Sequence, residues 1–460
     1  MRIDVNSILR ASQGVLLAGD RDASVCDFSI DSRVVKPNEA FIAIKGKRYD
    51  GHDFIIDAYK KGVRFFIIQK NSRIKTELKG SVLIKVEDTR KTLAKIAHLV
   101  RRQVDIPVIA ITGSCGKTTT KEMTASILES RFRVLKNIGT QNNEIGLPLT
   151  LLRLRKEHNI AILEMGMNHP GEITNLNRIA LANIGAITCI YPVHLKYLKD
   201  IKNIAKAKWE LIKTLRGKER VAILNNDDDN LVRLSKGYKG RIVTFGIKNK
   251  SDFMATDIQV GKDQLIFKVN RKEKISLNLI GEFNIYNALC AIAVSRLFKI
   301  SFDNIRESLS RFKPPPMRMN RIKLNGMILI NDGYNANPES MDLAIQTLSN
   351  LAQGRRSIVV CCDMLELGRF SKELHLKIGQ KIALSGIDCL ITMGKEAFFI
   401  YEGARRSGMD KSRIYYTKTA KEAASILKEI CQPEDIILFK GSRSMKPEEI
   451  AKCFMSYFTH

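Results

Sequence analysis

Short apolar segments alternate with helical patterns through the middle of the chain. The segments 107–112, 160–164 and 186–190 are mostly apolar, which is typical of strands buried on both faces. Between them, apolar residues recur at helical spacing, as in the pattern that begins at Lys117. This alternation predicts a parallel sheet covered by helices from residue 107 to about residue 313.

The pattern changes between residues 241 and 280. Strand-like segments follow one another there without intervening helices, at 241–245, 253–260, 264–269 and 275–279. Consecutive strands with short connections are typical of antiparallel pairing. We therefore predict an antiparallel appendage on the central sheet.

Two further units flank this central region. Before it, short strand and helix patterns predict a small α/β module, with elements at 40–44, 54–61, 64–69, 82–86 and 89–101. The triple proline at 314–316 cannot continue a helix and marks the next boundary. After it, four strand patterns alternate with helices such as 341–351 and 374–384, and the strands lie at 327–330, 357–361, 389–393 and 435–439.

Together these patterns predict an α/β protein of three domains. Residues 1–105 form a small N-terminal α/β module, and residues 106–313 form a central domain with a P-loop NTPase-like parallel sheet and the antiparallel appendage. Residues 314–460 form a doubly wound, Rossmann-like domain. A length of 460 residues agrees with this division, because a single core rarely grows so large.

The turn after the segment 107–112 carries the strongest chemical signal. Two glycines, Gly113 and Gly116, stand there between a strand and a helix that opens with Lys117 and Thr118. Glycines let backbone amides approach phosphate oxygens, and a helix N-terminus favours negative charge. Lys117 would contact the terminal phosphates, and the Thr118 hydroxyl would bind Mg²⁺. The loop predicts a polyphosphate site, although Ile111 stands where a strict Walker A motif has its first glycine.

The amino-acid composition is that of a globular protein without membrane-spanning segments. The chain is 44% hydrophobic and 27% charged, as soluble globular proteins are. Residues 1–21 lack an apolar signal-peptide core, and no segment approaches 18 uncharged apolar residues. We therefore expect a cytoplasmic protein without a transmembrane segment.

The net charge and the cysteine content do not by themselves identify a binding partner or a role for the thiols. The net charge of +28 would attract a nucleic acid, an acidic lipid surface or an anionic metabolite. No nucleic-acid-binding motif accompanies it, so we expect no specific nucleic-acid partner, while peripheral membrane contact stays open. Nine cysteines without CxxC spacing predict free, mostly buried thiols. Cys115, near a helix N-terminus, is either a stabilised thiolate or a tolerated small residue.

Other polar residues stand where ligands bind in α/β proteins. Glu164 ends an apolar strand and could hold Mg²⁺ opposite Thr118, or could be a helix cap or salt-bridge partner. His194 and Lys208 carry little signal when each is taken alone, because a lone histidine is more often structural than a ligand and a lone lysine is usually solvated. The cluster 331–338 also follows a strand.

Two asparagines mark another helix. Asn284 and Asn287 lie three residues apart, so they share one face near the start of an apolar helix. One of them could cap the helix, and a pair suggests contact with a polar ligand.

In this order, the motifs resemble the Mur ligase family, whose members use ATP to form amide bonds during peptidoglycan precursor synthesis. The resemblance spans nearly the whole chain and includes 31–33, 44–54, 141–146, 168–169 and 440–444. The form of the stretches 50–54 and 142–146 favours the member that adds D-alanyl-D-alanine. No DNPR-type signature for a diaminopimelate substrate is present.

The resemblance implies a reaction. ATP phosphorylates the carboxylate of UDP-N-acetylmuramoyl-tripeptide, and the amine of D-alanyl-D-alanine attacks the acyl phosphate, giving the pentapeptide precursor, ADP and phosphate. The implied catalytic residues are Lys117, Glu164, His194 and Lys208. One or two Mg²⁺ ions would be held by Thr118, Glu164, His194 and a carbamylated Lys208. The enzyme would be a monomer.

The resemblance also implies binding residues. The nucleotide would be contacted by Gly113, Ser114, Gly116, Lys117, Thr118, Thr119, Asn284, Asn287, Arg318, Asp332 and Tyr334, and closure of the C-terminal domain would complete this site. The UDP-peptide and the dipeptide would be contacted by Ser32, Arg33, Lys45, Gly46, His52, Asn142, Asn143, Lys440, Ser442 and Arg443.

Five positions depart from the family pattern. Lys196 and Lys199 stand where a carboxylate and a glycine are usual, and Phe283, Met317 and Cys362 replace a histidine and two glycines. We expect activity to survive, because no metal ligand and no phosphate-loop lysine is lost. The alternatives are another amide ligase of the Mur or folylpolyglutamate synthetase type, a P-loop ATPase stimulated by nucleic acid, and an inactive scaffold.

Overall fold

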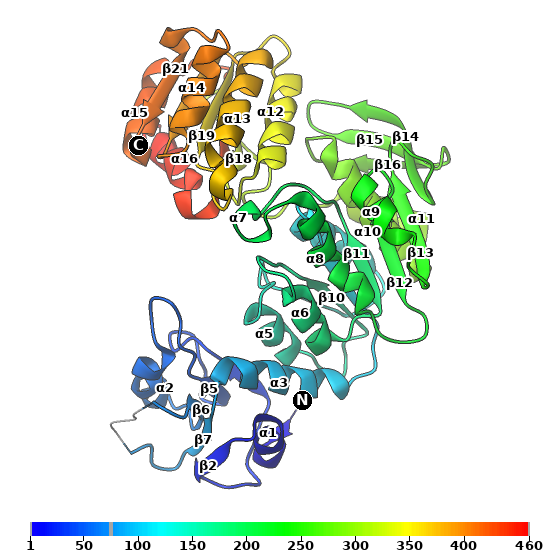
Figure 1. Ribbon diagram of the computed structural model, residues 1–460, viewed down its shortest axis with the longest axis vertical. Coiled ribbons are helices and arrows are strands. Elements are labelled where there is room, and N and C mark those ends of the chain that lie inside the picture. Colours follow the sequence, from blue (N-terminus) through cyan, green and yellow to red (C-terminus); the bar gives the residue numbers. More distant parts are fainter. Residues whose placement is uncertain (1, 73–76, 459–460) are drawn as a thin grey trace.

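The computed structural model describes residues 2–72 and 77–458 and arranges them in three lobes that follow the order of the sequence. In Figure 1 the N-terminal and C-terminal lobes lie at opposite ends, with the central lobe between them. The predicted three-domain α/β organisation is confirmed. The domain boundaries that we place near residues 105 and 313 stay predictions.

The N-terminal lobe is built on a mostly parallel sheet. In its described residues the strand order is β2-β7-β6-β5-β4, with only β2 antiparallel to its neighbour. These strands are β2 (Val15–Ala18), β4 (Asp27–Ser29), β5 (Glu39–Ile42), β6 (Phe65–Gln69) and β7 (Val82–Val86), while β1 (Ile3–Asp4) pairs with β3 (Ser24–Val25). The helices are α1 (Val5–Ser12), η1 (Gly51–Phe54), α2 (Ile55–Lys60) and α3 (Thr89–Arg102).

Helix α3 joins this lobe to the central one. It packs against α5 (Gly146–Leu152) and α6 (Glu172–Ala180) of the central lobe. The buried guanidinium of Arg101 donates hydrogen bonds to the carbonyl oxygens of Ala180, at 2.8 Å, and Ile106, at 3.1 Å. A buried cation without acceptors is costly, so these bonds help to fix the N-terminal lobe in place.

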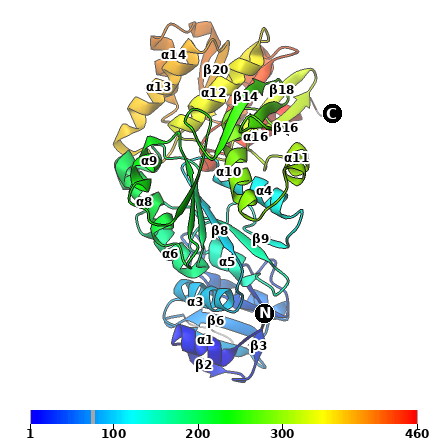
Figure 2. The same ribbon diagram turned by 90° about the vertical axis from the view of Figure 1, so that its right-hand side faces the viewer.

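The described residues of the central lobe form a nine-stranded sheet in the order β16-β15-β14-β13-β12-β11-β8-β10-β9. Its strands are β8 (Val108–Thr112), β9 (Val134–Lys136), β10 (Ile160–Glu164), β11 (Ile184–Ile187), β12 (Val221–Asn225), β13 (Arg241–Gly246), β14 (Phe253–Val260), β15 (Leu265–Val269) and β16 (Glu273–Leu277). Helices cover both faces, and Figure 2 shows α6, α8 and α9 on one side of the sheet and α4 and α10 on the other. These helices are α4 (Lys117–Leu128), α8 (Ile201–Lys213), α9 (Asp229–Ser235), α10 (Phe283–Leu297) and α11 (Phe302–Ser310).

Strand β8 shows why its first four residues are all apolar. Val108 and Ala110 face the core on one side of the sheet, and Ile109 and Ile111 face the core on the other. Successive side chains of a strand point to opposite faces, so a strand covered on both sides needs apolar residues at every position.

The predicted antiparallel appendage needs correction at its start. Strand β13 is parallel to both β12 and β14, and only β14, β15 and β16 pair antiparallel. Helix α9 intervenes between β12 and β13 and so allows their parallel pairing, whereas short turns connect β14 to β15 and β15 to β16. The segment 186–190 is also displaced, because β11 ends at Ile187, opposite Thr112.

The C-terminal lobe, described to residue 458, has a six-stranded sheet in the order β17-β18-β22-β19-β20-β21, parallel except for the edge strand β17. The strands are β17 (Asn320–Leu324), β18 (Met327–Asp332), β19 (Ser357–Cys362), β20 (Cys389–Met393), β21 (Ile414–Thr417) and β22 (Ile436–Lys440). The helices are α12 (Pro338–Ala352), η2 (Gly368–Phe370), α13 (Ser371–Leu384), α14 (Phe398–Arg406), η3 (Lys411–Arg413), α15 (Ala420–Ile430), η4 (Arg443–Met445) and α16 (Pro447–Ser456). The two edge strands β17 and β21 were not predicted, and in β17 the polar residues Asn320, Arg321 and Lys323 interrupt the apolar pattern.

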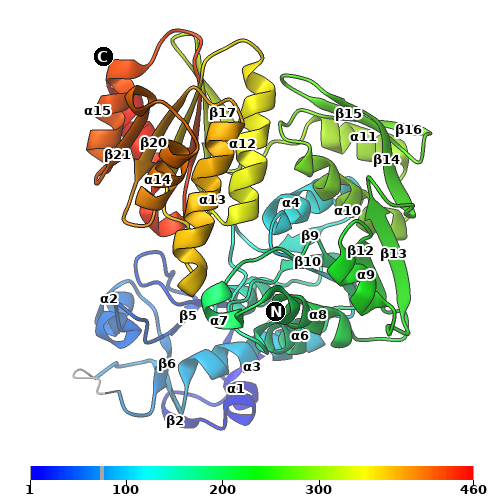
Figure 3. The same cartoon turned by 45° about the horizontal axis from the view of Figure 1, so that its top comes forward.

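The carboxyl ends of the parallel strands in the central sheet and in the C-terminal sheet lie on the sides where these two lobes meet. Short helix α7 (Leu195–Leu198) of the central lobe contacts η2 of the C-terminal lobe, and Figure 3 shows α7 beside the end of α13. The carboxyl ends of parallel strands are where α/β proteins bind ligands. All nine cysteines are free thiols, and among the described helices none has the length and apolar character needed to cross a membrane.

Candidate active site

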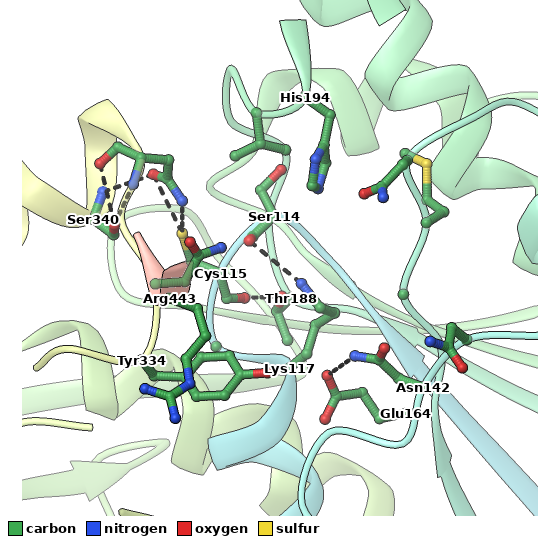
Figure 4. Close-up of a pocket in the computed structure, with 18 of the residues that line it drawn as sticks. Ser114, Cys115, Lys117, Asn142, Glu164, Thr188, His194, Tyr334, Ser340 and Arg443 are labelled. Atoms are coloured by element: carbon green, nitrogen blue, oxygen red, sulfur yellow. Dashed lines mark hydrogen bonds between the residues drawn. The ribbon is translucent and has the colours of Figure 1, made fainter. Parts of the chain in front are cut away.

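A large cavity lies where the three lobes meet. Its volume is about 1260 Å³, and it is lined by residues such as Arg90 of the N-terminal lobe, Glu164 of the central lobe and Asp332 of the C-terminal lobe. Figure 4 shows part of this lining, with Lys117, Glu164, His194 and Tyr334 projecting from different elements. Most of the residues proposed for nucleotide binding therefore surround one space.

The loop between β8 and α4 requires both of its glycines. Gly113 has φ +150° and Gly116 has φ +80°, values that disfavour residues with a side chain. A Cβ atom on Gly113 would lie 1.9 Å from Oγ1 of Thr188, and one on Gly116 would lie 2.2 Å from Oδ1 of Asn287. The loop thus brings its backbone against neighbouring side chains, and the first amides of α4 have no acceptor within the helix. Such a turn can hold phosphate oxygens.

Two lysines share one carbonyl group in this loop. The Gly113 carbonyl oxygen accepts hydrogen bonds from Nζ of Lys117 at 2.8 Å and from Nζ of Lys208 at 3.0 Å. Lys208 is only 2% exposed, and its burial, with the nearby charge of Lys117, lowers its pKa to about 7. A substantial fraction of Lys208 amines is therefore neutral near physiological pH.

Glu164 is a buried carboxylate with an unsatisfied oxygen. The residue is 1% exposed, and its Oε1 accepts a hydrogen bond of 2.6 Å from Nδ2 of Asn142. Its Oε2 is fully buried and has no hydrogen-bond partner among the described residues. Leaving a buried carboxylate oxygen unpaired is unfavourable, and a divalent cation would satisfy it. The unsatisfied Glu164 carboxylate therefore fits Mg²⁺, and Thr118, the second residue of α4, stays a predicted ligand.

His194 contacts the C-terminal lobe. Its backbone is left-handed, with φ 53°, and its Nδ1 lies 2.5 Å from Oε2 of Glu366. The hydrogen bond to His194 lowers the pKa of the Glu366 carboxyl. Among the described residues, no three His, Cys, Asp or Glu side chains gather as a metal site, so a cation at Glu164 or His194 would take further ligands from phosphate and water.

Residues of the C-terminal lobe reach into the phosphate loop region. The Arg318 guanidinium lies 4.1 Å from the ring centre of Tyr334, and its Nη2 donates a 3.2 Å hydrogen bond to Oγ1 of Thr118. The Tyr334 hydroxyl donates to Oγ1 of Thr140 at 2.6 Å. Asp332 forms an ion pair with the buried Nζ of Lys440. The lobes are thus joined around the place where phosphates would lie.

The asparagine pair on α10 lies on one face, as its spacing predicts. Asn287 donates a hydrogen bond of 2.9 Å to Oδ1 of Asn284, and Asn284 donates to the Ile280 carbonyl oxygen at 2.8 Å. Thr120 donates to Oδ1 of Asn287 at 3.2 Å. Ser114, Thr119 and both asparagines line the large cavity.

The residues proposed to contact the UDP-peptide are dispersed. Ser32 and Arg33 line a separate small pocket of about 340 Å³, whereas Lys45 and Gly46 lie exposed in the loop that precedes η1. Both ring nitrogens of His52 are engaged within the N-terminal lobe, Nδ1 with Asp50 at 2.5 Å and Nε2 with the amide of Gln69 at 3.0 Å. Substrate contact by these five residues stays a prediction.

The remaining substrate candidates lie on the cavity wall. Asn142, Asn143, Lys440, Ser442 and Arg443 all line it. Several also have structural contacts: Oδ1 of Asn143 accepts from the amides at the start of α5, and Oγ of Ser442 accepts from the Leu365 amide at 2.9 Å.

Two of the five unusual residues keep a glycine-like backbone. Lys199 has φ 71° and Met317 has φ 59°, both in the left-handed region that favours glycine. The Lys196 amide donates to the Glu366 carbonyl oxygen at 3.0 Å, which ties the altered loop to the C-terminal lobe. Phe283 lines the cavity, and Cys362 is fully buried beside Gly441.

Two residues that join the lobes here, Thr140 and Glu366, were not predicted from the sequence, and Asn337 was predicted only as part of a polar cluster. Glu366 follows the carboxyl end of β19, so the strand-end rule that singled out Glu164 could have found it. Asn337 caps α12 and lies inside the polar cluster 331–338. Thr140 carried no sequence signal.

A phosphate loop, a buried carboxylate and a facing second α/β lobe define a nucleotide-binding site, and comparison with known families shows that it belongs to an ATP-dependent amide ligase. Three family models match: the Mur ligase family catalytic domain over residues 28–101, the Mur ligase middle domain over 111–295, and the Mur ligase glutamate ligase domain over 317–443. The chain belongs to the Mur ligase family.

The chain is also similar over nearly its whole length to individual members of this family. The UDP-N-acetylmuramoyl-tripeptide–D-alanyl-D-alanine ligase of Bacillus subtilis (strain 168) is 36% identical over 92% of this chain and 91% of its own length. The enzyme of that name from Escherichia coli (strain K12) is 33% identical over 94% of each chain. Crystal structure I of MurF from Acinetobacter baumannii superposes with a TM-score of 0.88 at 29% identity, covering 99% of both chains. MurF ligase from Thermotoga maritima, solved in complex with ADP, has a TM-score of 0.81 at 28% identity, covering 94% of this chain and 98% of that one.

Proposed function

We propose that this chain is an ATP-dependent ligase that joins D-alanyl-D-alanine to UDP-N-acetylmuramoyl-tripeptide. The products are the pentapeptide precursor of peptidoglycan, ADP and phosphate. Relatives with this activity in their names match nearly the full length of the chain. The observation that carries the proposal is the cavity lined by all three lobes, because it places the phosphate loop and Glu164 beside residues of both outer lobes.

The chemistry begins with an acid that must be activated. An amine does not displace oxide from a carboxylate, because oxide is a very poor leaving group. Transfer of a phosphoryl group from ATP converts the carboxylate to an acyl phosphate, from which phosphate can leave. Both reactants are anions, and Lys117 and Arg318 supply positive charge where they would meet. The dipeptide amine then attacks the carbonyl carbon, and phosphate leaves.

Mg²⁺, when bound, neutralises phosphate charge and polarises the phosphoryl group. Glu164 and Thr118 would hold one ion, and His194 would belong to a second site. Contacts such as Tyr334 with Thr140 join the central and C-terminal lobes, and closure of the lobes around the substrates would keep water from the acyl phosphate.

We also propose that Lys208 is carbamylated. A neutral amine attacks the carbon of CO₂ and releases a proton, so the cation becomes a carboxylate-like anion. Burial and the depressed pKa of Lys208 supply the neutral amine. The product would be a ligand for a cation shared with His194, whereas an ammonium group would repel it.

The N-terminal lobe would bind the UDP portion, and the enzyme would act as a monomer in the cytoplasm. Sedimentation of the purified chain tests the monomer. Binding of UDP alone, weakened in an Arg33→Ala variant, tests the location of the nucleotide-sugar site.

A phosphate-release assay tests the function. We expect release to need ATP, Mg²⁺, the UDP-muramoyl-tripeptide and D-alanyl-D-alanine together, with a product whose mass equals the pentapeptide precursor. Release that proceeds equally well with a single amino acid as the amine would indicate another amide ligase. ATP consumption stimulated by polynucleotide and indifferent to the dipeptide would contradict the proposal.

The Tyr334 hydroxyl provides a smaller test of lobe closure. We expect Tyr334→Phe to raise KM for ATP about 2- to 10-fold, because one hydrogen bond between the lobes is lost. Tyr59→Phe is the matched control, since it removes a hydroxyl that hydrogen-bonds Lys79 in the N-terminal lobe. Equal KM values in both variants would argue against a role for the Tyr334 contact in nucleotide binding.

A further inference from the structure

Two cysteines meet beside the phosphate loop. Cys115 lies within the loop, and Cys189 lies two residues beyond the end of β11. The Cys115 amide donates to Sγ of Cys189 at 3.4 Å, and that Sγ is 3.6 Å from the Cys115 carbonyl oxygen. Both residues line the cavity, and the proposed ligase reaction uses neither.

The chain segments that carry these cysteines are held together. The Ser114 amide donates to the Cys189 carbonyl oxygen at 2.8 Å. The Ser114 hydroxyl donates to the Tyr191 carbonyl oxygen at 3.0 Å and accepts from the Tyr191 amide at 2.8 Å. Separation of the two cysteines would break these bonds, so they stay within reach of each other.

The two thiols differ in reactivity. Hydrogen bonds from Cys189 and Asn337, with the nearby charges of Lys117 and Lys440, lower the pKa of the Cys115 thiol. Burial raises the pKa of the Cys189 thiol. Cys115 is half-buried and lines the cavity, and Figure 4 shows it near Ser340 and Thr188. The pair therefore combines an accessible nucleophile with a protonated partner.

We propose that Cys115 and Cys189 form a reversible oxidative switch that responds to peroxides. The Cys115 sulfur attacks a peroxide oxygen, the O–O bond breaks, and with hydrogen peroxide a sulfenic acid and one water result. The Cys189 sulfur then displaces the sulfenic oxygen as a second water, after its proton has been transferred. Two thiols lose two electrons, hydrogen peroxide gains them, and an intramolecular disulfide forms. A dithiol restores both thiols by exchange.

The disulfide would disturb the loop that is proposed to hold phosphate. It would draw the Cys115 sulfur away from the Asn337 amide nitrogen, now at 3.4 Å, and so loosen a contact with the C-terminal lobe. We expect about a 100-fold loss of ligase activity, since small displacements of positioning groups have effects of this size. This part of the inference rests on the proposed function.

The test treats the purified full-length chain with hydrogen peroxide. Peptide mapping should identify a disulfide-linked pair of peptides containing Cys115 and Cys189, and dithiothreitol should restore both the thiols and the phosphate-release activity. ATP with Mg²⁺ should slow the reaction. The mapping does not depend on ligase activity, so a disulfide in a chain without ligase activity would contradict the proposed function and support the thiol chemistry.

Variants separate this switch from general oxidation. Each is compared with its own untreated activity. In Cys189→Ser the resolving thiol is absent, so peroxide should oxidise Cys115 beyond the sulfenic acid and dithiothreitol should fail to restore it. Cys431→Ser, a half-buried cysteine of the C-terminal lobe, should behave like the parent chain. Absence of the Cys115–Cys189 peptide pair, or full recovery of Cys189→Ser by dithiothreitol, would overturn the proposal.

Discussion

Replacing Lys117 with alanine is expected to reduce ligase turnover by about 10³-fold while the fold stays intact, because a cation aimed at developing phosphoryl charge is lost. Lys117 is the first residue of α4, and its Nζ contacts the Gly113 and Ser114 carbonyl oxygens of the same loop. The single-turnover rate of phosphoryl transfer measures the effect, and circular dichroism with thermal unfolding checks the fold.

The control for Lys117→Ala is Lys218→Ala, which removes an exposed lysine from the loop between α8 and β12. This variant loses the same charge from the protein and should keep its activity. Undiminished turnover in Lys117→Ala would remove the phosphate loop from the mechanism, whatever the family resemblance implies.

Replacing Lys208 with alanine is expected to lower turnover by a similar factor, about 10³-fold, for a different reason. The variant cannot form the carbamate, so the proposed anionic ligand for a cation beside His194 is missing. Added short carboxylates such as acetate or formate should restore part of the activity by occupying the emptied space. The measurement is the phosphate-release rate as a function of carboxylate concentration.

Lys206→Ala is the matched control, because Lys206 lies on the same helix but is exposed. It should retain activity and gain nothing from added carboxylate. A crystal structure of the parent chain grown with bicarbonate should show density for the carbamate on Lys208. An unmodified amine there, or a Lys208→Ala variant with normal turnover, would contradict the proposed role.

The hydrophobic pattern predicted most strands of the two parallel sheets, because strands covered on both faces must be mostly apolar, as β8 is. It gave no strand at β17 and the wrong pairing for β13. Edge strand β17 alternates polar and apolar residues, and β13 looks like the hairpin strands that follow it although it pairs in parallel. Pairing direction depends on the path of the connecting chain, which local composition does not encode.

In the candidate active site, too, some residues could be predicted from local sequence and others only from the tertiary structure. Gly113, Gly116 and Lys117 could be found from sequence because a phosphate loop is a local structure whose residues follow one another. The position of Glu366 after β19 can be recognised in the sequence. Its contact with His194 cannot, because the two residues are 172 positions apart. The unsatisfied oxygen of Glu164 became evident only in the fold, since burial is a property of the packed structure.

By itself, the sequence determined the order of the lobes, the phosphate loop and the family resemblance, because each depends on residues close together in the chain or on motifs in a set order. Only the tertiary structure decided which side chains share the cavity, that Lys117 and Lys208 meet at one carbonyl oxygen, and that Cys115 lies against Cys189. These arrangements result from long-range packing between strands and lobes, and such packing is set by the whole fold rather than by any local pattern.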